Sequence, residues 1–519
     1  VKKQYAVPVY DLGNIQNIPP AHLQFTISDQ LFFETLLMEI RGKTISYSSY
    51  KKKKETQEED RLSKLLFELE KNVSDSNTQI IEQTRNKLQD LRNAKLEGIA
   101  VRSRVRWVAD GEKNSRYFCN LENRNFTNKS VSFLEKEDGT IISNQKDILL
   151  EVQNFYQDLY SYRQVSDIEL RNLLPDAPVL NDDDCRILEG QITYEEALSA
   201  LKGMSNNKSP GPDGFTVEFY KFFFSDIGMF LIRSVNEGYE RGELSISQYQ
   251  GVITCIPKEG KPKQYIRNWR PISLLNVSYK IASSCIARRF QQVLPTIIHE
   301  SQKGFIKGRY IGENIRLLYD VLLYTEKENI PGLLLMIDFE KAFDSVSWCF
   351  IEKCLDFFHF PLSIIQWFRT LYMKASSCVS FNGQYSAWFR LYRGCRQGDS
   401  VSPYLYLICA EILSLMLRKN NSIKGIHVKD QEILLSLFAD DTTLFLDGSE
   451  QSFTYAIHTL DVFSTMSGLH VNNDKTQVVW IGSRRNCQVR YMRDKNFQWD
   501  PGIFRVLGIQ FSTIASELF

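Results

Sequence analysis

The stretch LLSLFADDTTLFL, residues 434–446, sets two neighbouring carboxylates, Asp440 and Asp441, between strongly apolar flanks. The flanks predict two short strands joined by a tight connection, so the acids would lie at the tip of a β-hairpin. An Asp-Asp turn on its own is in most cases only a turn. Two like charges beside a core are costly without a partner of opposite sign, which makes this pair a candidate site.

A second apolar run also ends in an acid. In GLLLMIDFEKAFDSVSW, residues 332–348, the wholly apolar segment Leu333–Ile337 predicts a buried central strand that carries Asp338 at its end. Ser345 or Ser347 could then cap a helix whose apolar face includes Trp348. Both candidate acidic positions therefore follow strands.

Composition indicates a folded intracellular protein with a basic segment. The 519 residues are 43% hydrophobic and 12% aromatic, which argues against disorder and predicts about two to four structural units. The net charge of +1 hides eleven Lys and Arg against two acids between Gly251 and Tyr310. Such an excess suits a polyanion such as nucleic acid, although a solvated charged face would have the same composition.

Several classes of protein are disfavoured. Ten cysteines occur without a CxxC pair or regular spacing, so neither a zinc site nor a disulfide framework is expected, and a reducing compartment is indicated. No apolar run is long enough to span a bilayer, and no membrane partner is expected. The first residue is Val1 rather than Met, which suggests a segment of a longer polypeptide.

The N-terminal part predicts helices and basic, aromatic surfaces. Apolar residues recur at helical spacing from Leu62 to Leu91, which predicts two amphipathic helices packed as a hairpin, with a coiled-coil partner as the alternative. Residues 102–118, RSRVRWVADGEKNSRYF, mix bases and aromatics in a way that can grip a phosphate backbone, and helix packing explains the aromatics equally well. Residues 206–215, NNKSPGPDGF, predict a loop.

Acids delivered by two strands suit one particular chemistry. Enzymes that join nucleotides hold two divalent cations about 3.5–4 Å apart, one activating a hydroxyl and one steadying the leaving group. Mg²⁺ prefers a few carboxylate oxygens supplemented by water and phosphate, and Mn²⁺ accepts the same ligands. Bound cations would offset the repulsion between Asp338, Asp440 and Asp441.

Eight segments, in this order, resemble the reverse transcriptase of LINE-type non-LTR retrotransposons. The resemblance extends from about Arg102 to Phe511, and it is specific because the segments keep the order of that family. The segments are NNKSPGPDGF, ITCIPKEGKP with NWRPISLLNVSYKI, QKGFIKGRY, DFEKAFDSVSW, RGCRQGDSVSPYLY, FADD, SGLHVNNDKT and RVLGI.

The resemblance implies the catalytic and substrate-binding residues. Asp338, Asp440 and Asp441 would bind two Mg²⁺ ions, and Lys475 would protonate the leaving pyrophosphate. The residues that would contact the incoming deoxynucleoside triphosphate are Lys258, Arg270, Phe339, Phe343, Gln397 and Gly398. Among them, Phe343 would be the steric gate that rejects a ribose 2′-hydroxyl, and Arg270 would grip the triphosphate. The residues that would contact nucleic acid are Arg104, Arg106, Lys113, Lys208, Lys303, Lys307 and Arg309.

The implied architecture is an α/β right-hand polymerase with fingers, a palm built on an antiparallel sheet, and a helical N-terminal extension. The expected segments are a helical linker (1–108), a basic extension (109–200), fingers (201–330), palm (331–500), and a primer-grip hairpin with the start of a thumb (501–519). The implied partners are an RNA template, a DNA primer or target, and deoxynucleoside triphosphates, with an endonuclease domain in the parent polyprotein. Target-primed insertion would occur in the nucleus, and the ribonucleoprotein would form in the cytoplasm.

Two other functions fit parts of the sequence. An intron-encoded maturase shares the fingers and palm, but the wording of the motifs favours the retrotransposon branch. A polymerase-like RNA-binding scaffold that has lost catalysis would be expected to have damaged acids, whereas Asp338, Asp440 and Asp441 are all present.

Overall fold

Helices and short strands follow one another in the computed structural model, which describes residues 28–71, 77–103 and 130–512. This mixture confirms the predicted α/β class. The chain divides into two compact units, and the predicted boundaries between extension, fingers and palm remain predictions. The smaller unit comprises Val1–Ile148, Ile256–Arg270 and Phe381–Gln384, and the larger comprises Leu149–Cys255, Pro271–Ser380 and Tyr385–Phe519.

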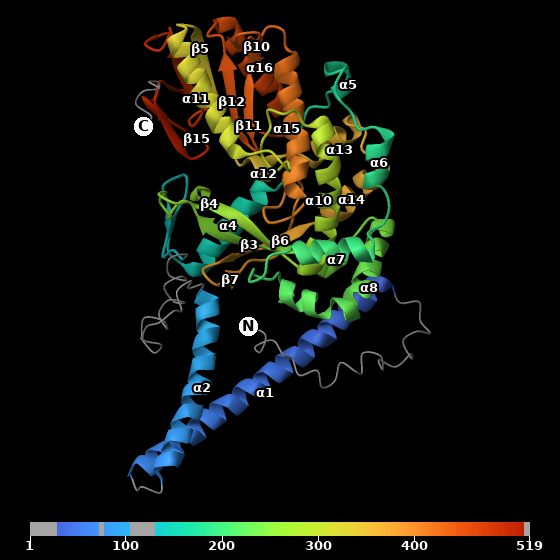
Figure 1. Cartoon of the computed structure of the whole chain (residues 1–519), viewed down its shortest axis with the longest axis vertical. Helices are drawn as coiled ribbons and strands as arrows, with labels where there is room; N and C mark the ends of the chain where they lie inside the picture. The colour runs from blue at the N-terminus through green and yellow to red at the C-terminus, as the bar shows by residue number, and fades with distance from the viewer. Residues whose placement is uncertain (1–27, 72–76, 104–129, 513–519) are drawn as a thin grey trace. The chain divides into compact units, whose positions relative to one another are not determined.

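The smaller unit contains the predicted helical hairpin. Helices α1 (Asp29–Lys71) and α2 (Thr78–Ser103) pack together where the end of α1 meets the start of α2 and diverge toward their other ends (Figure 1). Ion pairs join them near the packed end. Glu59 of α1, for example, pairs with Arg92 and Lys95 of α2. Helix α1 begins more than thirty residues before Leu62, where the apolar spacing starts, because the polar residues between Asp29 and Leu62 include many good helix formers. The lysine run that begins after Tyr50 lies within this helix and is exposed.

The remaining elements of the smaller unit are short. Strands β1 and β2 form an antiparallel hairpin, and the turn η3 precedes the buried Trp269, whose ring packs edge-on against Phe381. Their bounds are β1 Leu134–Glu135, β2 Ile141–Ile142 and η3 Ile266–Asn268.

Most of the helices belong to the larger unit. Their bounds are α4 Gln145–Leu159, α5 Leu170–Leu173, α6 Asp182–Leu188, α7 Tyr194–Gly203, α8 Val217–Arg241, α9 Ile246–Tyr249, α10 Val277–Ile297, α11 Ile311–Lys327, α12 Ala342–Ser345, α13 Trp348–Phe357, α14 Leu362–Tyr372, α15 Ser402–Lys419 and α16 Glu450–Ser467. The first four residues of α4 are assigned to the smaller unit.

The central sheet of the larger unit has the strand order β11-β12-β5-β13-β14. Neighbouring strands are antiparallel except for β13 and β14, which are parallel, so the predicted antiparallel sheet gains a parallel edge strand. Strand β5 lies between β12 and β13, with Leu335 opposite both Leu444 and Val478. The strand bounds are β5 Pro331–Ile337, β11 Leu435–Phe438, β12 Asp441–Leu446, β13 Gln477–Gly482 and β14 Gln498–Trp499.

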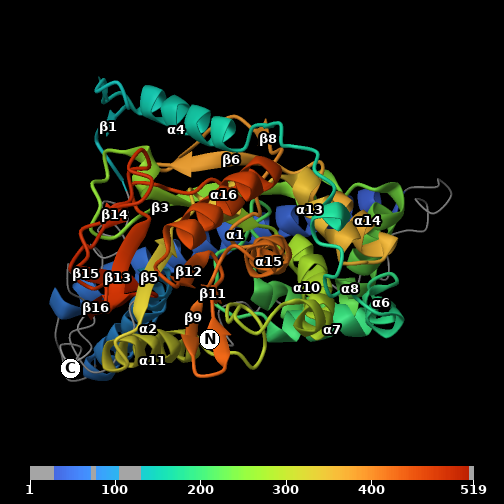
Figure 2. The same cartoon turned by 90° about the horizontal axis from the view of Figure 1, so that it is seen from above.

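Both faces of this sheet are covered, which explains why β5 is apolar at successive positions. On one face, Leu334 and Met336 pack in a core with Leu318 and Leu322 of α11. Helix α16 lies on the opposite side (Figure 2), where its Phe453 ring contacts Trp499. The hairpin of β15 (Ile503–Val506) and β16 (Ile509–Ser512) adds Phe504 and Phe511 to the α11 face.

A second sheet has the order β4-β3-β6-β7, with β8 also paired to β6. Its strands are β3 Gln250–Pro257, β4 Trp269–Leu275, β6 Ser376–Phe381, β7 Gln384–Tyr385 and β8 Phe389–Arg390. Strands β3 and β6 are parallel, which a short turn cannot join, and the chain between them includes α10–α14 and β5. A separate two-stranded ribbon is formed by β9 (Ile426–Val428) and β10 (Gln431–Ile433).

Several local predictions are confirmed. Residues 434–446 form the predicted hairpin. Ser347 is the N-cap residue of α13, although its side chain makes no capping hydrogen bond. Within the described part of the chain, no helix has both the length and the apolar composition that crossing a bilayer requires.

The packing of β5 predicts a large stability loss on truncation there. Leu335→Ala removes a fully buried side chain from the middle strand, and we expect the free energy of unfolding to fall by about 2–5 kcal/mol. Urea unfolding followed by tryptophan fluorescence measures it. Leu362→Ala, at a side chain that is 81% exposed, is the matched control and should change stability by less than about 0.5 kcal/mol.

Candidate active site

The connection between β11 and β12 is a strained two-residue turn. Phe438 pairs with Asp441, so Ala439 and Asp440 alone make the connection. Ala439 has φ of +56°, the left-handed region that residues with a Cβ rarely adopt, and two-residue hairpins usually place glycine at such positions. The surrounding structure must therefore stabilise this turn.

Gln302 is the residue that holds the turn. Its Oε1 accepts hydrogen bonds from the backbone N–H groups of Ala439 and Gly304, both at 2.9 Å, and its Nε2 donates to the Ala439 carbonyl at 3.4 Å. Gln302 is 2% exposed. A Cβ at Gly304 would lie 2.5 Å from the Ala439 nitrogen, so only glycine fits there.

The three predicted catalytic carboxylates converge at the end of the central sheet. Thr442 pairs with Ile337, which puts Asp441 and Asp338 next to each other, one residue beyond that pair on adjacent strands. Lys475 arrives from the loop before β13, and its Nζ lies 3.2 Å from Asp338 Oδ2. The same loop is fixed by the Asn472 N–H, which donates to the Asp338 carbonyl at 2.7 Å. The structure thus brings together Asp338, Asp440, Asp441 and Lys475.

Electrostatics show that the two hairpin carboxylates are crowded. Partial burial raises the pKa of Asp441 to about 6, with further contributions from Asp440 and Asp338. Burial likewise raises the pKa of Asp440, and the Asp338 charge adds to it. Asp440 and Asp441 both remain exposed to solvent. A bound cation would reverse these shifts.

The donor set suits a hard cation held only in part by protein. Among the described residues, no group of three or more His, Cys, Asp and Glu side chains forms a ready-made metal cage. Mg²⁺ commonly takes one or two carboxylates and completes its shell with water and substrate phosphate. The crowded carboxylates of Asp440 and Asp441, together with Asp338, fit that mode of binding.

The predicted gate and its neighbours lie in the larger unit. The half-buried Phe343 stacks on the buried Tyr406 ring at 4.5 Å between ring centroids, and Phe305 approaches Phe343 edge-on at 6.5 Å. Phe339 is only 9% exposed and pairs with Val471 through its backbone, so its ring offers little surface to a substrate.

Gln397 and Gly398 lie on a loop that is docked against β4. The Ser273 N–H donates to the Gln397 carbonyl at 2.8 Å, and a Cβ at Gly398 would lie 2.8 Å from the Ser273 oxygen. Gly398 also has φ of +107°, so this position requires glycine. Gly398 is exposed and Gln397 is partly exposed, as substrate contact would require.

A buried polar network supports this loop and was not predicted. Arg396 is 1% exposed and lies over the Tyr279 ring, 4.4 Å from its centroid. The carboxylate of Asp399 accepts hydrogen bonds from the hydroxyls of Tyr279 and Tyr372, both at 2.9 Å, and of Ser283. Both Arg396 and Asp399 belong to RGCRQGDS, which has apolar residues on both sides. Opposite charges in such a motif were the available sequence signal for a buried polar network.

The residues predicted to contact nucleic acid differ in how exposed their side chains are. Lys208 and Lys307 are exposed, and Lys303 forms an ion pair with Glu313. The Arg309 guanidinium is turned inward, where it donates to the carbonyls of Ile298, His299 and Gln302 at 2.6–2.9 Å. It therefore braces the segment that contains Gln302. Arg104, Arg106 and Lys113 lie outside the described residues.

Lys258 and Arg270 belong to the smaller unit. The Lys258 N–H donates to the Asn268 carbonyl at 2.8 Å, and its Nζ lies 3.3 Å from the Arg267 carbonyl. Arg270 follows the buried Trp269 in β4, where alternate residues face opposite sides, so its guanidinium is exposed. Exposure leaves Arg270 available to an anionic ligand.

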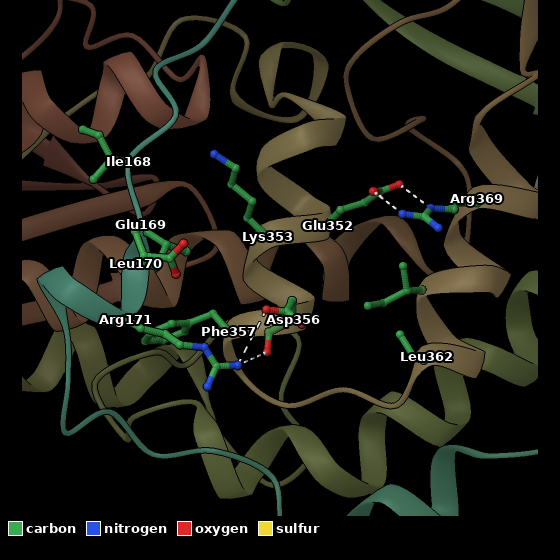
Figure 3. Close-up of a pocket in the computed structure, with 11 residues that line it drawn as sticks. Ile168, Glu169, Leu170, Arg171, Glu352, Lys353, Asp356, Phe357, Leu362 and Arg369 are labelled. Carbon is green, nitrogen blue, oxygen red and sulfur yellow. Dashed lines mark hydrogen bonds and ion pairs between the residues drawn. The ribbon is translucent and has the colours of Figure 1, made fainter.

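A separate cavity of about 360 Å³ lies among α5, α13 and α14 (Figure 3). None of the predicted site residues lines it. Four of its charged side chains are paired with one another, Glu352 with Arg369 at 2.9 Å and Asp356 with Arg171 at 3.6 Å, and Lys353 pairs with Asp167 outside the cavity. This cavity is therefore distinct from the carboxylate site.

The family model described as reverse transcriptase (RNA-dependent DNA polymerase) matches residues 256–511. These residues form a reverse transcriptase domain. The domain includes every predicted catalytic residue, and it also includes Gly304 and Gly398, at each of which a Cβ would collide with backbone.

Several relatives of this chain are named after transposons or retrotransposable elements. The "Transposon TX1 uncharacterized 149 kDa protein" of Xenopus laevis is 30% identical over 86% of this chain and 34% of its own length. The Pol polyprotein of the type-2 retrotransposable element R2DM of Drosophila melanogaster is 28% identical over 57% of this chain and 27% of its own length. The probable RNA-directed DNA polymerase from transposon BS of the same fly is 27% identical over 49% of this chain and 27% of its own length. The chain spans about a third or less of these relatives.

The raised pKa of Asp441 predicts a pH-dependent stability. Its folded pKa of about 6 exceeds the ordinary value of 3.8, so ionising it destabilises the fold, progressively from pH 4 to pH 6 and fully above that. We expect Asp441→Asn to raise stability at pH 8 by about 1 kcal/mol, a value reduced for solvent screening, and to have little effect near pH 3.5. Thermal unfolding without divalent metal across this range measures the effect. Asp430→Asn, in the exposed turn between β9 and β10, is the control, and equal shifts in both variants would contradict the interpretation.

Proposed function

We propose that this chain is an RNA-directed DNA polymerase of a non-LTR retrotransposon. It transfers a deoxynucleotide to the 3′-hydroxyl of a primer, under the direction of an RNA template, and releases pyrophosphate. The observation that carries the proposal is the convergence of Asp338 with Asp440 and Asp441 at adjacent strand ends within the matched domain. Its relatives' names, which include a Pol polyprotein and a probable RNA-directed DNA polymerase, support it.

Asp338 and Asp440 would hold Mg²⁺, with Asp441 beside them. Two bound cations would supply the positive charge that lowers the pKa of the primer hydroxyl and stabilises the leaving pyrophosphate, and Mn²⁺ could substitute. The fold supplies the carboxylates already crowded, so cation binding relieves repulsion instead of having to assemble the site. Gln302 keeps Asp440 in place by holding the preceding residue.

Other residues would act on the substrate directly. Lys475 would give a proton to pyrophosphate. Its ion pair with Asp338, one of the carboxylates that would hold the cations, supports this role. Phe343 would exclude a ribose 2′-hydroxyl, and Gln397 and Gly398 would contact the nascent base pair. Arg270, with Lys258, would bind the triphosphate.

The right-hand arrangement is also part of the proposal. The central sheet of the larger unit, with α11, α15 and α16, would be the palm, and the fingers would include the basic loops at Lys208, Lys303 and Lys307. These three lysines would contact the phosphate backbones of template and primer, and so would Arg309, Arg104, Arg106 and Lys113. In a parent polyprotein, an endonuclease would nick nuclear DNA to make the primer, after a ribonucleoprotein has formed in the cytoplasm.

Loss of one carboxylate tests catalysis. We expect Asp440→Asn to reduce primer extension on an RNA template with Mg²⁺ by about a thousandfold or more, because cation stabilisation contributes several kcal/mol. Template binding should change less than threefold. A gel-based extension assay with poly(rA)/oligo(dT) measures the rate, and Asp430→Asn is the control. A folded wild-type chain that binds RNA without extending primers would instead support the scaffold function.

Replacement of the gate tests sugar selection. Phe343→Val removes the ring that stacks on Tyr406, and we expect incorporation of ribonucleotides relative to deoxynucleotides to rise by about 10- to 100-fold. Phe343→Tyr retains the ring and should keep the wild-type preference. Single-nucleotide incorporation kinetics with paired ribo- and deoxynucleotides measure it. Equal selectivity of Phe343→Val and wild type would remove Phe343 from the gate.

A further inference from the structure

Asp344 is a buried carboxylate that accepts hydrogen bonds from two distant parts of the chain. It lies in α12, six residues after Asp338, and is 2% exposed. Its Oδ1 accepts a hydrogen bond of 2.7 Å from the Tyr160 hydroxyl, and its Oδ2 accepts one of 2.9 Å from Gln397 Nε2. A buried carboxylate with charge-assisted hydrogen bonds on both oxygens is held in one orientation.

Tyr160 is itself fixed from two sides. It follows the last residue of α4 and is 2% exposed. Its carbonyl accepts from the Tyr392 N–H at 3.0 Å, and Arg393 Nε donates to the neighbouring Leu159 carbonyl at 2.6 Å. Burial raises the pKa of the Tyr160 phenol well above its ordinary value, so the hydroxyl keeps its proton and remains a donor.

The chemistry of the pair fixes the Gln397 side chain. Both Asp344 oxygens accept hydrogen bonds, so the Gln397 amide faces Asp344 with its NH₂ group. Its carbonyl Oε1 is then left as the acceptor that the site can present. With the Gln397 backbone held by Ser273, neither the main chain nor the amide of this residue is free to reorient.

We propose that Tyr160 and Asp344 are positioning residues that orient the Gln397 amide, so that Oε1 accepts from a donor group of the incoming deoxynucleotide. This inference rests on the proposed polymerase function. Tyr160 lies outside residues 256–511. A segment that precedes the reverse transcriptase domain would therefore belong to the nucleotide site.

A purely structural role makes a different prediction. If the Tyr160–Asp344 bond only fastened the end of α4, its loss would lower stability and the fraction of active enzyme. The Michaelis constant for nucleotides would stay the same in the molecules that remain folded. An orienting role raises that constant and leaves the active fraction intact, since the amide can then turn its NH₂ group toward the nucleotide.

Tyr160→Phe removes only the hydroxyl. We expect the KM for deoxynucleotides to rise about 5- to 10-fold and kcat to fall less than threefold, because one hydrogen bond to a charged group is lost at a distance from the reacting atoms. Steady-state single-nucleotide incorporation with titration of active sites measures both constants. A KM within twofold of the wild-type value would overturn the proposal.

Tyr156→Phe is the matched control. Tyr156 lies one turn earlier on α4 and is fully buried, but among the described residues its hydroxyl has no carboxylate or amide as a hydrogen-bond partner. Its removal should leave KM and kcat unchanged. If Tyr156→Phe raised KM as much as Tyr160→Phe does, the effect would come from the packing of α4, and the orienting role would be wrong.

A double-mutant cycle tests the step from Asp344 to Gln397. Gln397→Glu sets two carboxylates against each other and should raise KM by more than tenfold. Asp344→Asn supplies an NH₂ donor, so in the double variant this donor can bond one oxygen of the introduced carboxylate and leave the other facing the site. We expect the double variant to recover at least threefold in KM relative to Gln397→Glu alone. Additive effects would overturn the proposal.

These experiments distinguish failure of the polymerase function from failure of the orienting role. An inactive wild-type chain would refute the polymerase function. An active wild-type chain whose KM is insensitive to Tyr160→Phe would refute only the orienting role.

Discussion

Repulsion among Asp338, Asp440 and Asp441 is the interaction around which the centre of the larger unit is organised. Burial raises the pKa values of Asp440 and Asp441, and the neighbouring carboxylates add to the shift, so these like charges would separate if the chain allowed it. The hairpin tip that carries two of them is itself strained at Ala439. The register of β12 on β5 prevents separation along the sheet. Because β5 is hydrogen-bonded on both edges, sliding it by one residue would break two ladders and turn its side chains to the opposite face.

The strain is confined by segments that arrive from elsewhere in the chain. Gln302 satisfies both polar groups of Ala439, and Arg309 in turn ties the loop of Gln302 to three carbonyl groups. On the other side, the loop through Asn472 and Lys475 bonds Asp338 through its backbone and its side chain. Each contact alone is worth about 1 kcal/mol or somewhat more. Acting together, they allow the site to exist before any cation binds, so little reorganisation is needed when substrate arrives.

The sequence was sufficient for features that depend on local pattern and insufficient for those that depend on distant partners. An apolar run before Asp338 and the flanks of Asp440 predicted strands with acids at their ends, because alternation and burial are properties of a short window. The same reasoning treated Arg309 as a nucleic-acid ligand, and it did not predict that the Arg309 guanidinium also donates hydrogen bonds to three carbonyl groups. The carbonyl groups that hold Arg309 belong to the helix end and loop around residues 298–302, whose path a window of charges does not reveal. Likewise, no local signal distinguishes the buried Phe339 from the half-exposed Phe343.

The hydrogen-bonded network around the candidate site includes residues outside the segment that matches the reverse transcriptase family. Residues 256–511 contain all the carboxylates, yet the hydrogen bond that fixes one oxygen of Asp344 comes from Tyr160. Arg393 and Tyr392, within the domain, bond the backbone of Leu159 and Tyr160, so the contact is made by two sets of interactions and not by one side chain. Because these groups are buried, removing their partners would leave polar atoms unsatisfied at a cost of about 1–3 kcal/mol each. The segment that ends α4 is therefore energetically part of the reverse transcriptase core, although it precedes the family match by almost a hundred residues.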